Sequence, residues 1–190
     1  GANNSNKYGA HFGVNNEAWC AFFVSWCLEQ IGIDDYGGEG ASWNFALAAR
    51  DRGIGTYHAK GSGYSPKMGD LFIEGFTGGY ADHIGIVKED ASGGQFSSID
   101  GNSSDAVSIV SARYVSDYCY VTPPYDGAAT SELKPQREVV IEVPAGLGTA
   151  YTYMNWSAIT NTSSTQYQLI NEAEANNDRH YDNEGYGMVG

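Results

Sequence analysis

The chain has 190 residues, with 23 acidic and 10 basic side chains and a formal net charge of -13 at neutral pH. No basic cluster occurs in it, which excludes nucleic acids and anionic membrane surfaces as favoured partners, because proteins bind both through groups of Lys and Arg. No run of about 18 apolar residues occurs either, so the sequence predicts no membrane span. A hydrophobic content of 42% predicts a folded protein rather than a disordered one.

A buried helix is predicted over residues 18–31, because no Gly or Pro interrupts them and their apolar side chains recur at helical spacing. Asn15 or Asn16 is the predicted cap of this helix, and Gly32 is its predicted stop. Cys20 then lies in the first turn, where the helix dipole and the free backbone N–H groups favour thiolate over thiol. The plainer interpretation is that Cys20 is one more small apolar residue of the core.

The elements around this helix are predicted in chain order. Residues 1–14 are polar and are predicted as an irregular lead-in. A second helix is predicted with Ser42 as its cap and Gly53 at its end, and Asp70 is expected to hold backbone N–H groups in a turn. Short strands are predicted within residues 54–65 and at residues 71–73, 83–88, 95–100, 107–110 and 118–121. Helices followed by an antiparallel meander predict an α+β fold.

A domain boundary is predicted near Pro123 and Pro124, which precede a small, polar run of residues. We therefore expect a domain over residues 1–124, followed by a linker and a C-terminal region over residues 125–190. Beyond the boundary, strands are predicted at residues 138–143 and 150–156, and residues 160–190 are mostly polar. This predicts a short, truncated, β-rich region of unknown role, because one or two strands make only a thin core.

The three cysteines do not form a disulfide framework. Cys20 and Cys27 are seven residues apart on one predicted helix, about 10 Å along its axis, which is too far for a bridge. A Cys27–Cys119 pair remains open and leaves Cys20 as an odd, reactive thiol. No metal site is predicted, because no Cys or His spacing is typical of zinc and the acidic residues of the 34–40 loop lack regular calcium-ligand spacing.

Three polar positions lie where a cysteine hydrolase needs them. Cys20 begins the buried helix, His83 begins a strand, and Asp100 or Asn102 ends the next strand along the chain. The two strands are predicted to pair antiparallel, which brings His83 near Asp100 and Asn102. An imidazole that takes the thiol proton and a polar group that orients the imidazole are the requirements of a thiol nucleophile. Gly85, on the same face as His83, is expected to leave an opening for a ligand.

Four pieces of the sequence, within residues 10–122, resemble the CHAP family (cysteine, histidine-dependent amidohydrolase/peptidase), which is related to the papain-like NlpC/P60 enzymes. They are Trp19-Cys20-Ala21-Phe22-Phe23-Val24-Ser25-Trp26, the Pro66-x-x-Gly69-Asp70-Leu71-Phe72 turn and strand, Asp82-His83-Ile84-Gly85-Ile86-Val87, and Asp100-Gly101-Asn102. The resemblance implies a papain-like domain with N-terminal helices packed on an antiparallel sheet. It also implies hydrolysis of an amide bond in a stem peptide, a cross-bridge or the sugar–peptide link of peptidoglycan.

Carried over to this sequence, the resemblance implies Cys20 as nucleophile and His83 as general base and later acid. Asn102 or Asp100 is the implied third member, and the sequence does not choose between them. The family is common in bacteria and their phages, which implies an extracellular or wall-associated protein. No cofactor is implied, and we expect a monomer.

An amide side chain shortly before the cysteine is expected to complete the oxyanion hole, and Asn15 and Asn16 are the candidates. Trp19 and Trp43 are expected to wall the substrate groove, although Trp19 can equally anchor the helix in the core. Two other functions stay open. One is a non-catalytic wall-binding or phage or conjugation tail component, and the other is a transferase or toxin-like amidase that acts on a different amide.

Overall fold

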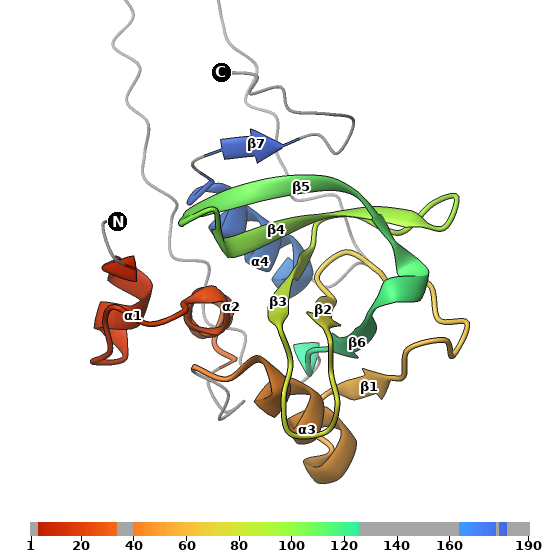
Figure 1. Ribbon diagram of the computed structural model, residues 1–190. Helices are drawn as coiled ribbons and strands as arrows, with labels where there is room; N and C mark the ends of the chain where they lie inside the picture. The colour runs from red at the N-terminus through yellow and green to blue at the C-terminus, as the bar shows by residue number, and fades with distance from the viewer. Residues whose placement is uncertain (1–3, 34–39, 126–163, 178, 182–190) are drawn as a thin grey trace, which may run out of the picture.

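A computed structural model describes residues 4–33, 40–125, 164–177 and 179–181 (Figure 1). Its helices are α1 (Lys7–His11), α2 (Cys20–Gln30), α3 (Ser42–Arg52), the 3-10 helix η2 (Val115–Asp117) and α4 (Ser164–Glu174). Its strands are β1 (Thr56–His58), β2 (Leu71–Glu74), β3 (His83–Val87), β4 (Gln95–Ser103), β5 (Ala106–Tyr114), β6 (Cys119–Thr122) and β7 (Arg179–Tyr181).

The described strands form one sheet in the order β1-β6-β2-β3-β4-β5-β7. Every neighbouring pair from β1 to β5 is antiparallel, and β7 is added parallel to β5 at the edge. β2, β3, β4 and β5 are consecutive in the chain and in the sheet, as the predicted meander requires. The expected α+β fold, with N-terminal helices packed on an antiparallel sheet, is confirmed.

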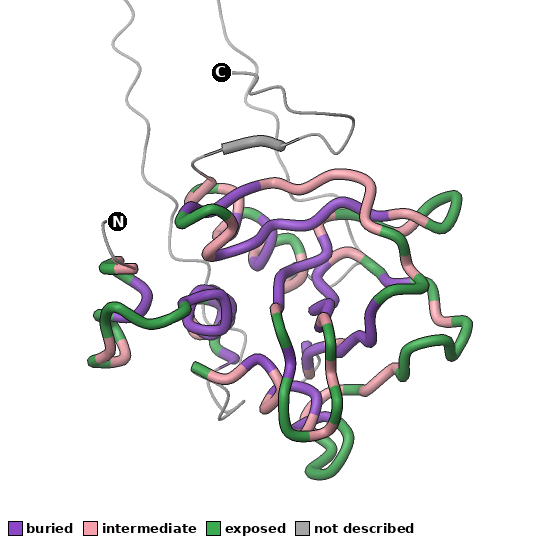
Figure 2. Tube along the Cα trace, in the orientation of Figure 1, coloured by how far each residue is buried: buried purple, intermediate pink, exposed green. Residues whose placement is uncertain are grey.

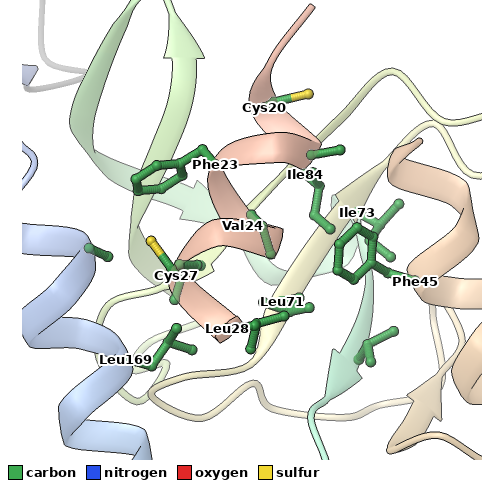
Figure 3. Packing of buried hydrophobic residues seen from close by; sticks show 14 of the residues in the cluster. Cys20, Phe23, Val24, Cys27, Leu28, Phe45, Leu71, Ile73, Ile84 and Leu169 are labelled. Atoms are coloured by element: carbon green, nitrogen blue, oxygen red, sulfur yellow. The ribbon is translucent and has the colours of Figure 1, made fainter. Parts of the chain in front are cut away.

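The main hydrophobic core lies between the sheet and α2. The tube of α2 is buried over most of its length in Figure 2, and Figure 3 shows its side chains among those of α3, α4 and the strands. Fully buried members of this core include Phe23, Val24, Cys27, Leu28, Phe45, Ile84, Ile86 and Leu169. At Gly101 of β4 an added Cβ would lie 2.4 Å from the Cβ of Phe23, so α2 reaches this closeness to the sheet only because position 101 is glycine.

The start of α2 differs from the prediction. The helix begins at Cys20, with Trp19 at the N-cap and no side-chain hydrogen bond to the cap. Asn15 and Asn16 lie in an exposed turn before it and do not cap it. Gly32 follows the last turn in a left-handed conformation, with a φ of 81°, and is the stop that the sequence predicts. Cys20 is therefore the first helical residue, where the free N–H groups are concentrated.

The opposite face of the sheet carries a second, smaller cluster of buried side chains, namely Phe72, Val87, Phe96, Tyr118 and Tyr120. Asp70 is fully buried at the start of β2. Its carboxylate accepts hydrogen bonds from the Lys67 backbone N–H, the Tyr64 hydroxyl and the Thr122 hydroxyl, each at 2.7 Å. The predicted structural role of Asp70 in this turn is therefore confirmed.

Two of the described α-helices are absent from the sequence prediction. α1 lies within residues 1–14, which were predicted as irregular, and the side chain of Asn6 caps it by accepting hydrogen bonds from the N–H groups of Tyr8 and Gly9. α4 lies within residues 160–190, where polar side chains hide its short apolar stripe. Leu169 and Ala173 of α4 are fully buried against α2, in the main core.

The C-terminal region is described only in part. α4 and β7 lie beyond the predicted boundary, and both contact elements of residues 1–124. The strands predicted at residues 138–143 and 150–156, like most of the acidic 34–40 loop, lie outside the described residues. The division into two regions stays a prediction.

Cys27 and Cys119 are both buried and free, so the disulfide that the sequence left open is not formed. No helix in the described part of the chain is both long and apolar enough to cross a bilayer.

Candidate active site

Cys20 and His83 meet at the ends of the elements that carry them. Cys20 is the first residue of α2, and His83 is the first residue of β3. In Figure 3 the Cys20 sulfur points away from the buried side chains further along the helix. Cys20 is 7% exposed and the His83 side chain 19% exposed, so both are mostly enclosed but reach the surface. The two groups are close enough for each to shift the pKa of the other.

The imidazole of His83 is held from its far side by Asp100 of β4. The His83 Nε2 atom lies 2.9 Å from the Asp100 Oδ2 atom, which leaves Nδ1 as the nitrogen available to the thiol. Asp100 is completely buried. A buried carboxylate behind an imidazole fixes the ring orientation and stabilises its charged form.

The pKa values of the thiol and the imidazole move in opposite directions. Burial acts to raise the pKa of Cys20, but the hydrogen bond and charge of His83, with a hydrogen bond from Ser42, lower it below the ordinary thiol value. Burial acts to lower the pKa of His83, but its bonds to Asp100 and Cys20 raise the pKa to about 10. The imidazolium is therefore the favoured form of His83 near neutral pH, and the Cys20 thiol ionises more readily than an ordinary cysteine.

Ser42 was predicted to cap the second helix, and the structure gives it a different place. Ala41 is at the N-cap of α3, without a side-chain hydrogen bond, and Ser42 is the first helical residue. Its Oγ atom lies 3.7 Å from the Sγ atom of Cys20. Two helices thus begin at the same point, and a hydroxyl from one contacts the thiol of the other.

Asp100 has three side-chain partners. Its Oδ2 atom accepts from His83 and, at 2.5 Å, from Nη2 of Arg113, while its Oδ1 atom accepts from the Ser98 hydroxyl at 2.6 Å. Burial acts to raise the pKa of Asp100, but the His83 hydrogen bond and the Arg113 charge outweigh it and lower the pKa below its usual value. The carboxylate is therefore ionised although no part of it reaches solvent.

The expected opening at Gly85 is not present. A Cβ at this position would lie 2.5 Å from the Phe72 ring and 2.8 Å from the Asp100 carboxylate. The space beside the glycine is therefore filled by these two side chains. The absence of a side chain at Gly85 leaves room for the Asp100 carboxylate beside His83. It does not leave room for a ligand.

Of the two candidates for the third member, Asp100 is the one that contacts His83. Asn102 adopts a left-handed conformation with a φ of 61°, within a stretch where the register of β4 and β5 shifts. No hydrogen bond joins its side chain to His83 within the described residues. Asn102 was predicted to lie near the imidazole because a regular strand was assumed. The strand is not regular at Asn102.

The oxyanion candidates stay predictions. Asn15 and Asn16 are both exposed, and the Asn15 Oδ1 atom accepts a hydrogen bond of 3.4 Å from the Asn6 backbone N–H. Among the described residues, neither side chain is hydrogen-bonded to Cys20. The backbone N–H of Cys20 is in the first turn of a helix, where N–H groups lack intrahelical acceptors.

The two tryptophans have different surroundings. Trp43 follows Ser42 on α3 and stacks on Tyr80, with ring centroids 6.2 Å apart. Tyr80 is 54% exposed in the loop before β3, so this pair is open to solvent. Trp19 is only 2% exposed and stacks on Tyr8, and it donates from Nε1 to Asp105. Its ring is packed in the core, which is the alternative that the sequence left open for Trp19.

The described residues contain no group of three or more His, Cys, Asp and Glu side chains placed to bind a metal ion. A family model described as CHAP domain matches residues 12–102, which include Cys20, His83 and Asp100. Residues 12–102 form a CHAP domain. Neither the comparison with curated proteins nor that with solved structures found a match.

CHAP domains are generally amidases or peptidases that act on peptidoglycan, and they are usually cysteine-dependent. Three side chains were missed from the sequence, namely Ser98 and Arg113, which contact Asp100, and Tyr80, which stacks on Trp43. Arg113 was missed because the fifth strand was predicted to end at residue 110, whereas β5 continues to Tyr114. An arginine in a strand next to a buried acid is the signal that would have found it.

Proposed function

We propose that this CHAP domain hydrolyses an amide bond of peptidoglycan by a thiol mechanism. Cys20 is the nucleophile, His83 exchanges the proton, and Asp100 holds the imidazole. The observation that supports this most directly is the hydrogen bond between His83 and the buried Asp100, together with the opposite pKa shifts that Cys20 and His83 cause in each other. The three side chains supply what cysteine hydrolysis requires, namely a nucleophile, a proton carrier and a group that orients the imidazole.

In the first half of the reaction the Cys20 thiolate attacks the carbonyl carbon of the substrate amide. The carbon–sulfur bond forms as the carbonyl π electrons move to oxygen. The backbone N–H of Cys20, with Asn15 or Asn16 as the predicted partner, stabilises the negative oxygen. The His83 imidazolium then donates its proton to the amide nitrogen, the carbon–nitrogen bond breaks, and the amine leaves. A thioester on Cys20 and a neutral His83 remain.

In the second half, water attacks the thioester. Neutral His83 accepts a proton from the water, and the new carbon–oxygen bond forms. The carbon–sulfur bond then breaks, which releases the carboxylic acid and restores the Cys20 thiolate beside the His83 imidazolium. Asp100 stays ionised throughout and keeps the ring in one orientation, because its carboxylate is bound on the side away from the thiol.

The substrate is proposed to bind across the exposed face of the Trp43–Tyr80 pair. Both rings are close in sequence to residues of the site. Trp43 follows Ser42, and Tyr80 precedes His83 by three residues. Aromatic faces suit sugar rings and the apolar parts of peptides. Peptidoglycan lies outside the bacterial membrane, so we propose that the protein acts extracellularly or at the cell wall, as a monomer.

Two variants test this proposal. Cys20→Ala removes the nucleophile and His83→Ala removes the proton carrier, so each is expected to lower the clearing of purified cell walls by about 1,000-fold or more. The matched control is His11→Ala, because His11 is an exposed histidine paired with Glu29 on the surface. Circular dichroism checks that all three variants keep the wild-type fold.

Full clearing activity in Cys20→Ala or in His83→Ala would contradict the proposed mechanism. If the wild type binds walls in a pull-down but releases neither amino groups nor reducing ends, the non-catalytic wall-binding function is favoured instead. Mass spectrometry of the wall fragments identifies the bond that is cut, because hydrolysis leaves new termini.

A further inference from the structure

Arg113 of β5 is connected to the site through three separate groups. Its Nη2 atom donates to Asp100 Oδ2 at 2.5 Å, its Nε atom donates to the Ser98 hydroxyl at 2.8 Å, and its Nη1 atom donates to the Tyr118 hydroxyl at 2.9 Å. Ser98 in turn donates to the other oxygen of Asp100. Both oxygens of the carboxylate are therefore fixed by a network that begins at one guanidinium.

The guanidinium is enclosed by aromatic rings. It lies 4.5 Å from the centroid of the Phe72 ring and 5.6 Å from that of Tyr118, and only 14% of the side chain is exposed. A charge in such surroundings is screened much less than one on the surface. Its field therefore acts on Asp100 and, beyond it, on His83.

One oxygen serves both cations. The Asp100 Oδ2 atom is the partner of His83 Nε2 and of Arg113 Nη2. We infer that Arg113 is a positioning residue, which orients the Asp100 carboxylate and limits how strongly that carboxylate raises the basicity of His83. This inference rests on the function proposed above, in which the Cys20–His83 pair carries out the hydrolysis.

The sign of the electrostatic effect follows from the charge of Arg113. A fixed positive charge disfavours protonation of every neighbouring group, so it lowers the pKa of both His83 and Cys20. Removing that charge should raise both pKa values. A lysine keeps the charge but is a single ammonium, which cannot hold Asp100, Ser98 and Tyr118 together. The two substitutions therefore separate charge from geometry.

The first measurement is the rate of Cys20 alkylation by iodoacetamide as a function of pH, with the modified peptide identified by mass spectrometry. This rate reports the pKa of the thiol and needs no substrate. The variants are Arg113→Met and Arg113→Lys. The matched control is Arg50→Met, which removes a positive charge from the surface of α3. The second measurement is kcat and KM for wall hydrolysis.

We expect Arg113→Met to raise the alkylation midpoint by about half a pH unit or more, and Arg50→Met to leave it unchanged. We expect Arg113→Lys to keep the wild-type midpoint but to lower kcat about tenfold at unchanged KM, because the carboxylate is less well oriented. If Arg113→Met does not fold, the kcat and KM of Arg113→Lys test whether Arg113 orients the carboxylate.

An unshifted midpoint in folded Arg113→Met, or wild-type turnover in Arg113→Lys, would overturn the inference. Failure of the proposed hydrolysis has a different signature. In that case the wild type itself cleaves no wall, while the alkylation midpoints still show whether Arg113 acts on the thiol.

Discussion

At the scale of single residues, Gly85 shows how closely the site depends on an absent side chain. The Asp100 carboxylate and the Phe72 ring occupy the volume that a Cβ at position 85 would need. The carboxylate must pass this point to reach His83. A methyl group here therefore affects packing and the orientation of the imidazole together.

Gly85→Ala is expected to lower the free energy of unfolding by about 1–3 kcal/mol through overpacking, and to reduce wall clearing more strongly than stability alone explains. Denaturant unfolding and a clearing assay measure the two effects. The matched control is Gly79→Ala, because a Cβ at Gly79 has no neighbour within 4 Å and its backbone is ordinary. A Gly85→Ala protein with wild-type clearing would show that Asp100 does not need this space.

At the scale of elements, the important arrangement is the meeting of two helix starts with the start of a strand. α2 brings the thiol, α3 brings the Ser42 hydroxyl, and β3 brings the imidazole. The first residues of two helices are thus in contact at this sulfur, and free N–H groups and positive dipole ends occur at helix starts. This is an environment in which a thiolate is stabilised without a metal ligand or a surface charge.

Ser42→Ala is expected to raise the pKa of Cys20, because the hydroxyl hydrogen bond is one of the interactions that lower it. Activity requires the thiolate, so it should be lost at a higher pH as the solution is acidified. The alkaline limit should stay near pH 10, where His83 loses its proton. Both limits are read from kcat/KM against pH. Ser116→Ala, on the exposed η2 helix, is the control, and an unchanged acid limit in Ser42→Ala would contradict the role of the hydroxyl.

The sequence predicted the elements better than their ends. Helical spacing located α2, and short runs of strand-forming residues between turns located β2, β3 and β4, which are buried almost continuously. The start of α2 was misplaced, since the capping pattern of Asn15 and Asn16 is a local signal and tertiary packing overrides it. β5 was predicted too short because residues 111–113 are Ser, Ala and Arg, which do not read as a strand. Arg113 was lost from the candidate site for the same reason.

At the scale of the whole molecule, the chain beyond residue 160 contributes to the same core as the CHAP domain. Leu169 and Ala173 of α4 are fully buried against α2. Lys88 and Glu174 form an ion pair of 3.1 Å on the surface beside them. Composition alone could not predict that α4 joins the core, because α4 is mostly polar. Its few apolar residues are buried only by contact with α2.

Leu169→Ala is expected to lower the free energy of unfolding by about 2–5 kcal/mol, because it leaves a cavity beside α2. Tyr167→Ala on the same helix is the control, since Tyr167 is 40% exposed and its loss should change stability by less than that of the fully buried Leu169. Chemical denaturation of the two variants measures the difference. Equal stability of the two would show that α4 does not belong to the cooperative core.

The groups that activate Cys20 come from distant parts of the chain, and this has a consequence for synthesis. The thiol is made near the beginning, but His83, Asp100 and Arg113 leave the ribosome much later and act only after β3, β4 and β5 have paired. A nascent chain therefore carries an unremarkable cysteine until the sheet is complete. Selective reaction of Cys20 at a pH below the ordinary thiol pKa, with the buried Cys27 and Cys119 protected, is then a sign that folding has finished.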